Sequence, residues 1–535
     1  MGAMPTPSLT LPRSRARFER AVLGAALALL IGACAPRSTM VVAVDAPGVA
    51  PTADELKRDL YAFADDSMRG RESGTIDEHR AAAFLADRIK LLGLEPAGDS
   101  GFFQRVPLTR TELTSETSVV VTMPNGVTRT LKVGPEVAPA PSLGPGAPAP
   151  KRFADAELVF AQYGIVNKKL DRDDFAGVDA KGKILVMVLD APANADSVQK
   201  TMYAGPNGIA PRFTAAMQRG VVGIVLVCLG KGAEIYGPAS SQFLHAVGPR
   251  DTSRVPSEDE RPLPPVIFAS EAASGALVPA GWPARANAQF AAGTKLRVRV
   301  VAKRTQVTDY NVVGIVRGSD AALAMSYVAV GAHLDHDGVR SGESPDSIAN
   351  GADDDGSGSV TALAIARAAM QGPRTRRSWL FVWHTAEEKG LLGSDYFTAH
   401  PTVPIDSIAA QLNADMVGRN GDDSLYIVGP ASAPKSQSVV LGGVVDSVNA
   451  AMTRPFIFDR SFDSPTHPER IYFRSDHFNY AKLGVPIIFF TTGLHPDYHK
   501  VTDSPEKIAY PKMARVATLM WQVGVAVGNR STRPK

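Results

Sequence analysis

The sequence predicts an α/β fold, with a sheet covered by helices, for the part of the chain that begins near Tyr310. Two observations support this prediction. Apolar runs typical of buried strands recur as "SYVAVGAH", "SWLFVWH" and "GVPIIFFTTG". A helical pattern, "VTALAIARAAM", stands between the first two runs. Such alternation of strands and helices is typical of a sheet that carries helices on its faces.

The composition is that of a globular protein. Of 535 residues, 44% are hydrophobic and 21% are charged, and the formal net charge is +3. Since domains usually contain about 100–200 residues, this length predicts more than one domain. No basic stripe with interleaved aromatic residues is present, so binding to nucleic acid is not expected.

The first 34 residues predict an export signal. Four arginines precede "AVLGAALALLIGA", an apolar stretch too short for a good membrane span but suited to a signal peptide. The residues "IGAC" resemble a bacterial lipobox, in which Cys34 is lipidated and becomes the mature N-terminus. Ala35 is not the aspartate that the lipoprotein pattern associates with inner-membrane retention. We therefore expect an exported, lipid-anchored protein, on the outer membrane or facing the periplasm. An ordinary signal peptide with a coincidental cysteine is the alternative.

Residues 35–52 predict a flexible tether, and 53–150 the first part of the main domain. Within that part, 77–93 has helical spacing and ends at Gly93, a residue suited to a helix C-terminus. Residues 119–134 predict a hairpin that turns at Asn125–Gly126.

Residues 138–150 are rich in proline, alanine and glycine and mark a boundary. After it, 151–297 predicts a compact β-rich unit of short apolar strands with a helix near 211–220. Cys228 lies in one of these strands and is expected to be an inert core thiol. If Cys34 is lipidated, Cys228 has no disulfide partner.

Acidic and imidazole side chains follow the apolar runs of the last part, 298–530. They are His333, Asp335 and His336, then Asp353, Asp354 and Asp355, then Glu387 and Glu388, then Asp415, then His495, Asp497 and His499. Taken singly, such groups are typical of surface turns and helix N-termini. Because open α/β sheets bind ligands at the carboxyl ends of their strands, we expect these groups to converge there.

Convergence of so many carboxylates is costly without a cation, so the sequence predicts a metal site. Nitrogen and oxygen ligands with no nearby cysteine favour zinc, while manganese or cobalt is possible. A pair of metals about 3.5–4 Å apart is the usual arrangement for hydrolysis at a carboxylate-rich site.

The sequence resembles the di-zinc aminopeptidases, a family that also contains glutamate carboxypeptidases. The matching motifs are "GAHLDH", "GADDDGSGSVTALAIAR", "TAEEKGLLGS", "LNADMVG", "RSDHFNYAKLGVPIIFFTTG" and "HPDYHKVTDSPEKI". This resemblance implies the zinc exopeptidase fold, a mixed, mostly parallel central sheet with helices on both faces. Residues 151–297 resemble a protease-associated domain inserted into the peptidase domain, with an ordinary structural insertion as the alternative.

Carried over to this chain, the resemblance implies two zinc ions. His333 and Asp415 would hold one, Glu388 and His499 the other, and Asp354 would bridge them. Asp354 is chosen because the bridging residue of the family lies two positions before a glycine, here Gly356. The family commonly has asparagine where this chain has Asp355.

The resemblance also implies the remaining roles. Glu387 would be the base that takes a proton from a water bridging the metals, and Tyr498 would stabilise the oxyanion. Asp335 would orient His333. Arg474 would contact substrate, or else form a surface or structural ion pair. Asp476 and His477 fit a supporting role.

We therefore expect an exported di-zinc exopeptidase, an aminopeptidase that removes N-terminal residues from peptides. A carboxypeptidase of the glutamate carboxypeptidase type is the alternative, although it would need an arginine cluster to bind the terminal carboxylate. A non-catalytic, receptor-like relative would have lost ligands that this chain retains. A single-zinc acyl transferase such as a glutaminyl cyclase fits "TAEEKGLLGS" less well.

Overall fold

The computed structural model describes residues 49–140, 151–237, 245–249, 264–285, 287–340, 346–433 and 437–534. The expected signal peptide, Cys34 and most of the expected tether lie outside these ranges. Among the helices that the structure describes, none combines the length and the apolar character needed to cross a bilayer.

The central sheet has the strand order β13, β15, β14, β16, β19, β17, β18. The bounds are β13 (Lys295–Val316), β14 (Tyr327–His333), β15 (Ser378–His384), β16 (Ile408–Ala414), β17 (Ser424–Val428), β18 (Ile457–Asp459) and β19 (Ile487–Thr491). β15, β14, β16 and β19 are mutually parallel, β13 runs antiparallel to β15, and β17 runs antiparallel to β19 but parallel to β18. The expected mixed, mostly parallel sheet is confirmed.

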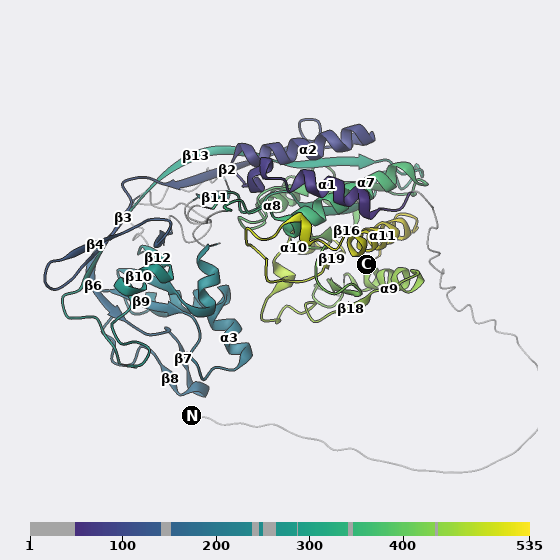
Figure 1. The fold of residues 1–535 in the computed structure, drawn as a ribbon. Helices are drawn as coiled ribbons and strands as arrows, with labels where there is room; N and C mark the ends of the chain where they lie inside the picture. The colour runs from purple at the N-terminus through teal and green to yellow at the C-terminus, as the bar shows by residue number, and fades with distance from the viewer. Residues whose placement is uncertain are drawn as a thin grey trace, which may run out of the picture. The chain divides into compact units, whose positions relative to one another are not determined.

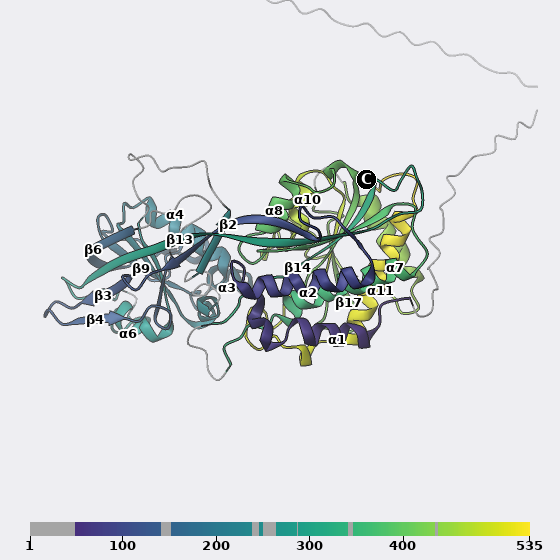
Figure 2. The same ribbon diagram turned by 90° about the horizontal axis from the view of Figure 1, so that it is seen from above.

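Helices cover both faces of this sheet. One face carries α1 (Ala53–Phe63), α2 (Ile76–Leu92), α7 (Gly358–Gln371), α9 (Val439–Ala451) and α11 (Tyr510–Gly528), while the other carries α8 (Leu392–Ala399) and α10 (His477–Lys482). α7 and α11 lie side by side (Figures 1 and 2). Successive residues of a strand face opposite sides of the sheet. Phe381 of β15 therefore packs against the face that carries α7 and α11, and Leu380 against the face that carries α8 and α10.

Two expected local elements are confirmed. α2 begins after Thr75, whose hydroxyl accepts a hydrogen bond from the backbone N–H of Asp77, and it ends at Gly93. Gly93 has a φ of 83°, which glycine adopts without steric cost. The hairpin pairs β3 (Ser118–Thr122) with β4 (Thr128–Leu131).

β13 is longer than the sequence analysis indicates. Its first half pairs with β3 and with β6 (Lys151–Phe160), and its second half with β2 (Phe103–Leu113) and β15. The boundary expected between residues 297 and 298 therefore falls inside one continuous strand.

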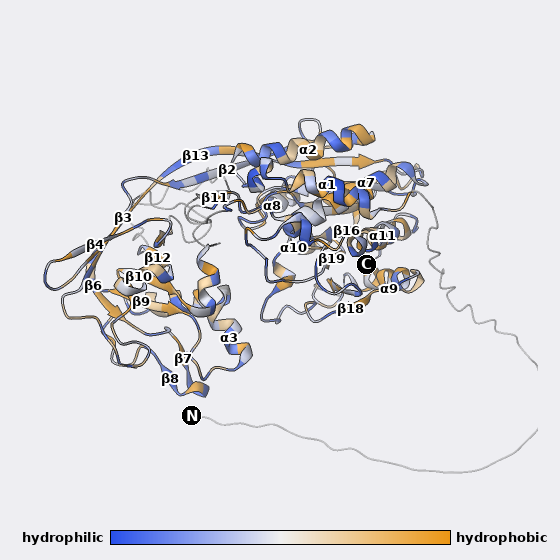
Figure 3. Cartoon of the chain, in the orientation of Figure 1, coloured by the Kyte–Doolittle hydropathy of each residue, from blue (hydrophilic) through white to orange (hydrophobic). Residues whose placement is uncertain are grey.

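The β-rich part contains a second parallel arrangement. β9 (Ile184–Leu189), β10 (Gly223–Cys228) and β12 (Val266–Ala269) are parallel, and every residue in them is buried. Figure 3 shows these strands as largely hydrophobic. The thiol of Cys228 is buried, which raises its pKa to about 12, so the thiol is inert at neutral pH. Whether this part is a protease-associated domain stays a prediction.

Shorter elements complete the description. They are β1 (Glu95–Pro96), β5 (Val137–Pro139), β7 (Val166–Asn167), β8 (Arg172–Asp173), α3 (Ser197–Ala204), α4 (Ile209–Met217), β11 (His245–Pro249) and α6 (Ser274–Leu277). α4 corresponds to the helix expected near residues 211–220.

Candidate metal centre

The five expected ligands lie together at the carboxyl ends of the parallel strands. His333 ends β14, Glu388 and Asp415 follow β15 and β16, His499 follows β19, and Asp354 precedes α7. Asp354 Oδ1 lies 3.2 Å from His333 Nε2, and Asp354 Oδ2 lies 3.1 Å from His499 Nε2. His499 Nε2 is 3.2 Å from Glu388 Oε2, and His333 Nε2 is 3.8 Å from Asp415 Oδ2. The two oxygens of Asp354 thus face two separate histidines.

The donor atoms fit divalent cations such as zinc. The Nε2 atoms of His333 and His499 are buried and have no hydrogen-bond partner among the described residues. Zinc–ligand bonds of about 2.0–2.2 Å place neighbouring ligand atoms of a tetrahedron about 3.3–3.6 Å apart. The separations at this site scatter around that range, and imidazole with carboxylate is a ligand set that zinc accepts.

Asp355 holds the site together rather than facing its centre. Its carboxylate accepts hydrogen bonds from the backbone N–H groups of His333, Met416 and Gly358. These three groups belong to β14, to the segment after β16 and to α7. An asparagine at this position would offer only one oxygen for the same three donors.

Asp335 supports two parts of the site at once. Its backbone oxygen lies 3.2 Å from His333 Nδ1, and its Oδ1 lies 3.7 Å from the same nitrogen. The carboxylate also accepts hydrogen bonds from the backbone N–H of Glu387 at 3.0 Å and from the hydroxyl of Ser73 at 2.7 Å. Asp335 therefore orients both the imidazole and the loop that carries the two glutamates.

Three further residues of the loop after β14 contact the site. The sequence predicts His336 among the strand-end groups, whereas it indicates no role for Asp337 and Arg340. His336 Nδ1 lies 2.7 Å from Glu388 Oε1, which leaves Oε2 to face His499. Asp337 Oδ2 lies 3.3 Å from His499 Nδ1, and Arg340 donates to that carboxylate at 2.8 Å. Their closeness to His333 in the sequence is the only signal that could have indicated them.

Arg71 reaches the site from the N-terminal part of the chain. Its fully buried guanidinium donates to the backbone carbonyls of Leu334, Asn350 and Gly351 at 2.9, 2.6 and 2.9 Å. Burial lowers the pKa of Arg71 to about 10, while Asp335 and three other carboxylates act in the opposite direction. Arg71 is therefore a permanent positive charge beside the site.

Electrostatics separate the roles of the carboxylates. Burial raises the pKa of Glu387 well above its ordinary value, and the charge of Glu388 adds to this, although His333 opposes it. Burial alone would raise the pKa of Asp354 as well, but hydrogen bonds with His333 and His499 hold it well below its usual range. Glu387 thus holds a proton more readily than an ordinary glutamate, whereas Asp354 stays ionised.

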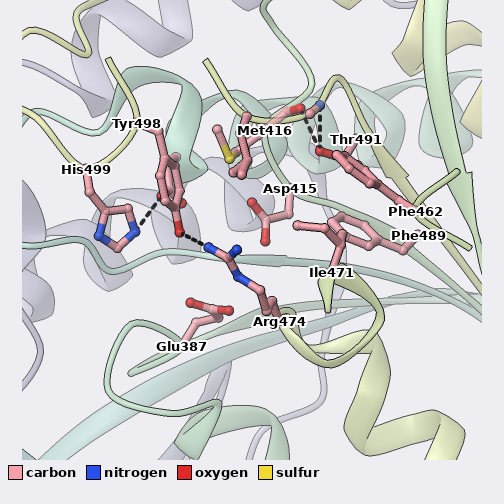
Figure 4. A pocket seen from close by; sticks show the side chains of 13 residues that line it. Glu387, Asp415, Met416, Phe462, Ile471, Arg474, Phe489, Thr491, Tyr498 and His499 are labelled. Atoms are coloured by element: carbon pink, nitrogen blue, oxygen red, sulfur yellow. Dashed lines mark hydrogen bonds and ion pairs between the residues drawn. The ribbon is translucent and has the colours of Figure 1, made fainter. Parts of the chain in front are cut away.

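A pocket opens onto these residues (Figure 4). Met416, Phe462, Ile471, Phe489 and Leu494 form its apolar lining, and Asp354, Glu387, Asp415, Arg474, Tyr498 and His499 its polar lining. In Figure 4, Phe462, Phe489 and Ile471 lie on the side opposite to His499. The site therefore combines charged groups with an apolar recess.

Arg474 and Tyr498 meet at the polar side of this pocket. Arg474 donates a hydrogen bond of 2.9 Å to the hydroxyl of Tyr498, and its Nη1 lies 3.4 Å from Glu469 Oε2. Burial raises the pKa of Tyr498 to about 12, while His499 and Arg474 act to lower it. The hydroxyl is therefore protonated at neutral pH. Arg474 both lines the pocket and forms an ion pair.

The other polar residues of the expected strand-end clusters lie elsewhere. His495 pairs with Asp353, and Asp497 pairs with Arg419 and Lys507.

Asp476 and His477 are buried apart from the five ligands. Asp476 Oδ2 lies 3.3 Å from His384 Nδ1, and His477 Nε2 lies 2.8 Å from the carbonyl oxygen of Tyr472.

Comparison with known proteins identifies the family of this region. Residues 311–524 match peptidase family M28. This part of the chain is similar to M28 peptidase domains. The family expected from the sequence motifs is thereby confirmed.

Curated relatives match the same region. The chain is 29% identical over 245 residues to a probable leucine aminopeptidase 1 from Trichophyton verrucosum, covering 43% of this chain and 61% of that protein. It is 29% identical over 237 residues to leucine aminopeptidase 1 from Arthroderma otae, covering 42% of this chain and 59% of that protein. The chain thus spans less than two thirds of the length of these relatives.

Solved structures align over a larger share of this chain than the curated relatives do. An aminopeptidase from Aneurinibacillus sp. strain AM-1 aligns over 90% of this chain and 96% of its own, with 18% identity and a TM-score of 0.55. A zinc aminopeptidase from Bacillus subtilis aligns over 91% and 97%, with 18% identity and a TM-score of 0.56. At this level of identity the likeness establishes the fold, which is the expected one.

Proposed function

We propose that this protein is a metal-dependent aminopeptidase that hydrolyses the first peptide bond of its substrates. The observation that carries this proposal is the position of Asp354, whose two carboxylate oxygens face His333 and His499 beside a pocket. The M28 domain supports it, as do relatives that are named leucine aminopeptidases.

Two divalent ions, with zinc the best fit, would be held by the five ligands, with Asp354 between the ions. When bound, such a pair polarises the scissile carbonyl and makes a water molecule more acidic. Side chains of this protein would carry the proton, stabilise the oxyanion and bind the substrate.

Glu387 would carry the proton. Its carboxyl group lines the pocket, and the hydrogen bond from its backbone N–H to Asp335 fixes its loop. Its raised pKa suits a group that accepts a proton from the attacking water and then gives it to the leaving amine. Transfer of this kind contributes about 10²–10⁴-fold in rate.

Tyr498 would stabilise the negative charge that develops on the carbonyl oxygen. Its hydroxyl lines the same pocket and is protonated at neutral pH. Arg474 fixes this hydroxyl by its hydrogen bond and adds positive charge nearby. A donor held in place before the reaction has no reorganisation cost when the charge forms.

The pocket also favours a free amino end. Asp415 and Glu387 lie near the apolar recess, and carboxylates in such a position pair with a substrate ammonium group. Phe462, Ile471 and Phe489 would then surround the side chain of the first residue. An apolar side chain fits this lining better than a charged one.

Arg474 also keeps a carboxypeptidase in consideration. A guanidinium in the pocket lining can bind a terminal carboxylate, but Arg474 already has Glu469 and Tyr498 as partners. No other arginine or lysine belongs to the described lining of the pocket. A single arginine that already has two partners is weak support for recognition of a terminal carboxylate.

Three substrates distinguish these activities: leucine anilide, the same anilide with a blocked amino group, and a peptide with a blocked amino group and a free carboxyl end. We expect cleavage of the first substrate only, loss of activity with a chelator, and its recovery with zinc. Metal content is measured on the same sample. Cleavage of the third substrate alone would indicate a carboxypeptidase, and activity that survives complete metal removal would rule out metal catalysis.

We also propose that the protein is exported and anchored through a lipid on Cys34, as the segment "IGAC" indicates. Cys34→Ser should move the protein from the membrane fraction to the soluble fraction, as immunoblotting of fractionated cells would measure. Ser38→Ala, four residues further on, is the matched control and should leave the distribution unchanged. A Cys34→Ser protein that still sediments with membranes would contradict the anchor.

A further inference from the structure

A second group of buried acids lies between α2 and β13. It is separate from the five expected ligands His333, Asp354, Glu388, Asp415 and His499, which are called the M28 centre below. Glu78 belongs to the first turn of α2, next to His79, and Asp309 belongs to β13. His79 Nε2 lies 3.5 Å from Asp309 Oδ1 and 3.9 Å from Glu78 Oε2. The same nitrogen is 2.8 Å from the carbonyl oxygen of Thr308. Because a carbonyl oxygen only accepts, His79 Nε2 donates this last hydrogen bond when no cation is bound. Three side chains from two elements therefore converge.

The two carboxylates are buried and short of partners. Glu78 and Asp309 are 0% exposed. Neither oxygen of Glu78, nor Asp309 Oδ1, has a hydrogen-bond partner of normal geometry among the described residues. Thr385 and the backbone of Tyr310 lie near enough to Glu78 to lower its pKa, but burial and the charge of Asp309 raise it more. Buried carboxylate oxygens without partners are strongly unfavourable, so the group needs a positive charge.

The spacing of these atoms resembles that of the M28 centre. There, donor atoms that face one another lie 3.1–3.8 Å apart, and here the separations from His79 Nε2 are 2.8, 3.5 and 3.9 Å. The two distances to carboxylate oxygens lie near the edges of a coordination shell with metal–ligand bonds of about 2.0–2.2 Å, whereas the 2.8 Å contact is a hydrogen bond to the carbonyl of Thr308. Two carboxylates and an imidazole form a ligand set that zinc accepts, and carboxylate oxygens also suit manganese.

We propose that Glu78, His79 and Asp309 bind a divalent cation, zinc or manganese, separate from the cations of the M28 centre. The side chain of His79 is 35% exposed, so an ion can reach the group from solvent. A shared proton between Glu78 and Asp309, with His79 charged, is the competing way to relieve the repulsion.

A cation here would act on the M28 centre through the chain. Asp309 Oδ2 accepts hydrogen bonds from the backbone N–H of Gly74 at 2.7 Å and from the hydroxyl of Thr385 at 3.5 Å. Thr385 is two residues before Glu387. The ion would therefore join α2, β13 and the loop that carries the base, and its expected effect is on the stability of that loop.

Metal stoichiometry of the full chain tests the proposal. Wild type and Glu78→Gln are equilibrated with zinc or with manganese, and bound metal is measured by mass spectrometry. We expect the wild type to bind one equivalent more than Glu78→Gln. Asp87→Asn, an exposed acid on the same helix, should match the wild type. Equal stoichiometry of wild type and Glu78→Gln with both ions would overturn the proposal and favour the shared proton.

A second variant guards against loss of folding in Glu78→Gln. His79→Gln removes the partly exposed ligand, and Co²⁺ reports occupancy through its visible absorption. The variant should lose the absorption of one equivalent of Co²⁺. Added Co²⁺ should also raise its melting temperature less than it raises that of the wild type. Unchanged absorption and melting in His79→Gln would contradict the site. These measurements need no substrate, so they stand whether or not the protein is an aminopeptidase.

Discussion

Two parallel sheets in this chain are built alike, yet among the described residues the candidate metal centre lies at the strand ends of one of them. β14, β15 and β16 are buried along their whole length, and so are β9, β10 and β12. Helices or neighbouring strands cover both faces of a parallel sheet, so polar groups are left to the strand ends. The difference between the two sheets therefore lies in the residues that follow their strands.

The strand ends of both sheets contact a buried arginine, and those of the central sheet also contact buried carboxylates. In the β-rich part, the buried guanidinium of Arg212 donates to the carbonyl oxygens of Tyr163, Tyr203 and Asp190. At the M28 centre, the carboxylates of Asp335 and Asp355 accept from backbone N–H groups. A guanidinium that donates to carbonyl oxygens needs no further ion. Buried carboxylates that accept from backbone N–H groups still carry a negative charge, which a metal ion can offset. The comparison shows that the sheet supplies position and the loops supply chemistry.

The largest expected effect comes from removing the base without changing its shape. Glu387→Gln should lower kcat for leucine anilide by about 10²–10⁴-fold, because the amide cannot accept the proton. Bound metal and the free energy of unfolding should stay near those of the wild type, since Glu387 is not among the expected ligands. Steady-state kinetics with metal analysis measure both. A variant with near-normal kcat would show that another group is the base.

The second sheet should respond in stability alone. Leu226 in β10 is 1% exposed, and Leu226→Ala should reduce the free energy of unfolding by about 2–5 kcal/mol through the cavity that it leaves. Urea unfolding measures this loss, and kcat below the transition should be unchanged. Val222→Ala, at a more exposed position just before β10, is the control. A large fall in kcat of folded Leu226→Ala would mean that the β-rich part takes part in catalysis.

A smaller loss of stability should appear as pH falls, because of a buried histidine in α10, a helix that packs on the central sheet. Burial lowers the pKa of His477 to about 4, below the value of about 6.5 expected in the unfolded chain. The unfolded state therefore binds a proton first, and stability present above pH 6.5 is lost as pH falls toward 4. Between pH 7 and pH 4 the loss amounts to about 3 kcal/mol.

His477→Gln can keep the hydrogen bond to the carbonyl of Tyr472 but cannot titrate. Urea unfolding at several pH values should show that the variant loses less stability on acidification than the wild type. His467→Gln, a change at a less buried histidine, should follow the wild-type profile. Identical acid profiles for wild type and His477→Gln would contradict this assignment.

The place of three of the five expected ligands was predictable because each follows an apolar run, whereas the choice of the full set, Asp354 included, came from the family resemblance. His333, Glu388 and Asp415 stand at the ends of three strands whose hydrophobic pattern is strong, and parallel strands bring such ends together. The same reasoning cannot find Arg71 or Asp503. Asp503 accepts from the backbone N–H groups of Asp353 and Asp354, but nothing local in the sequence indicates that contact.

Two elements were missed for a different reason. β2 and the first half of β13 alternate exposed and buried residues, with charged side chains on the exposed face. Their pattern lacks the continuous apolar run by which the other strands were found. Half-buried strands need the period of two to be searched for directly.

Arg71 has a consequence for how this protein can be divided. The M28 match begins at residue 311, yet the guanidinium that holds the carbonyls of Leu334, Asn350 and Gly351 comes from 240 residues earlier in the chain. A gene fragment that begins at the family boundary would omit this side chain together with α1 and α2. The border of the family match therefore does not coincide with the border of the contacts that hold this strand end, since these contacts include the N-terminal segment.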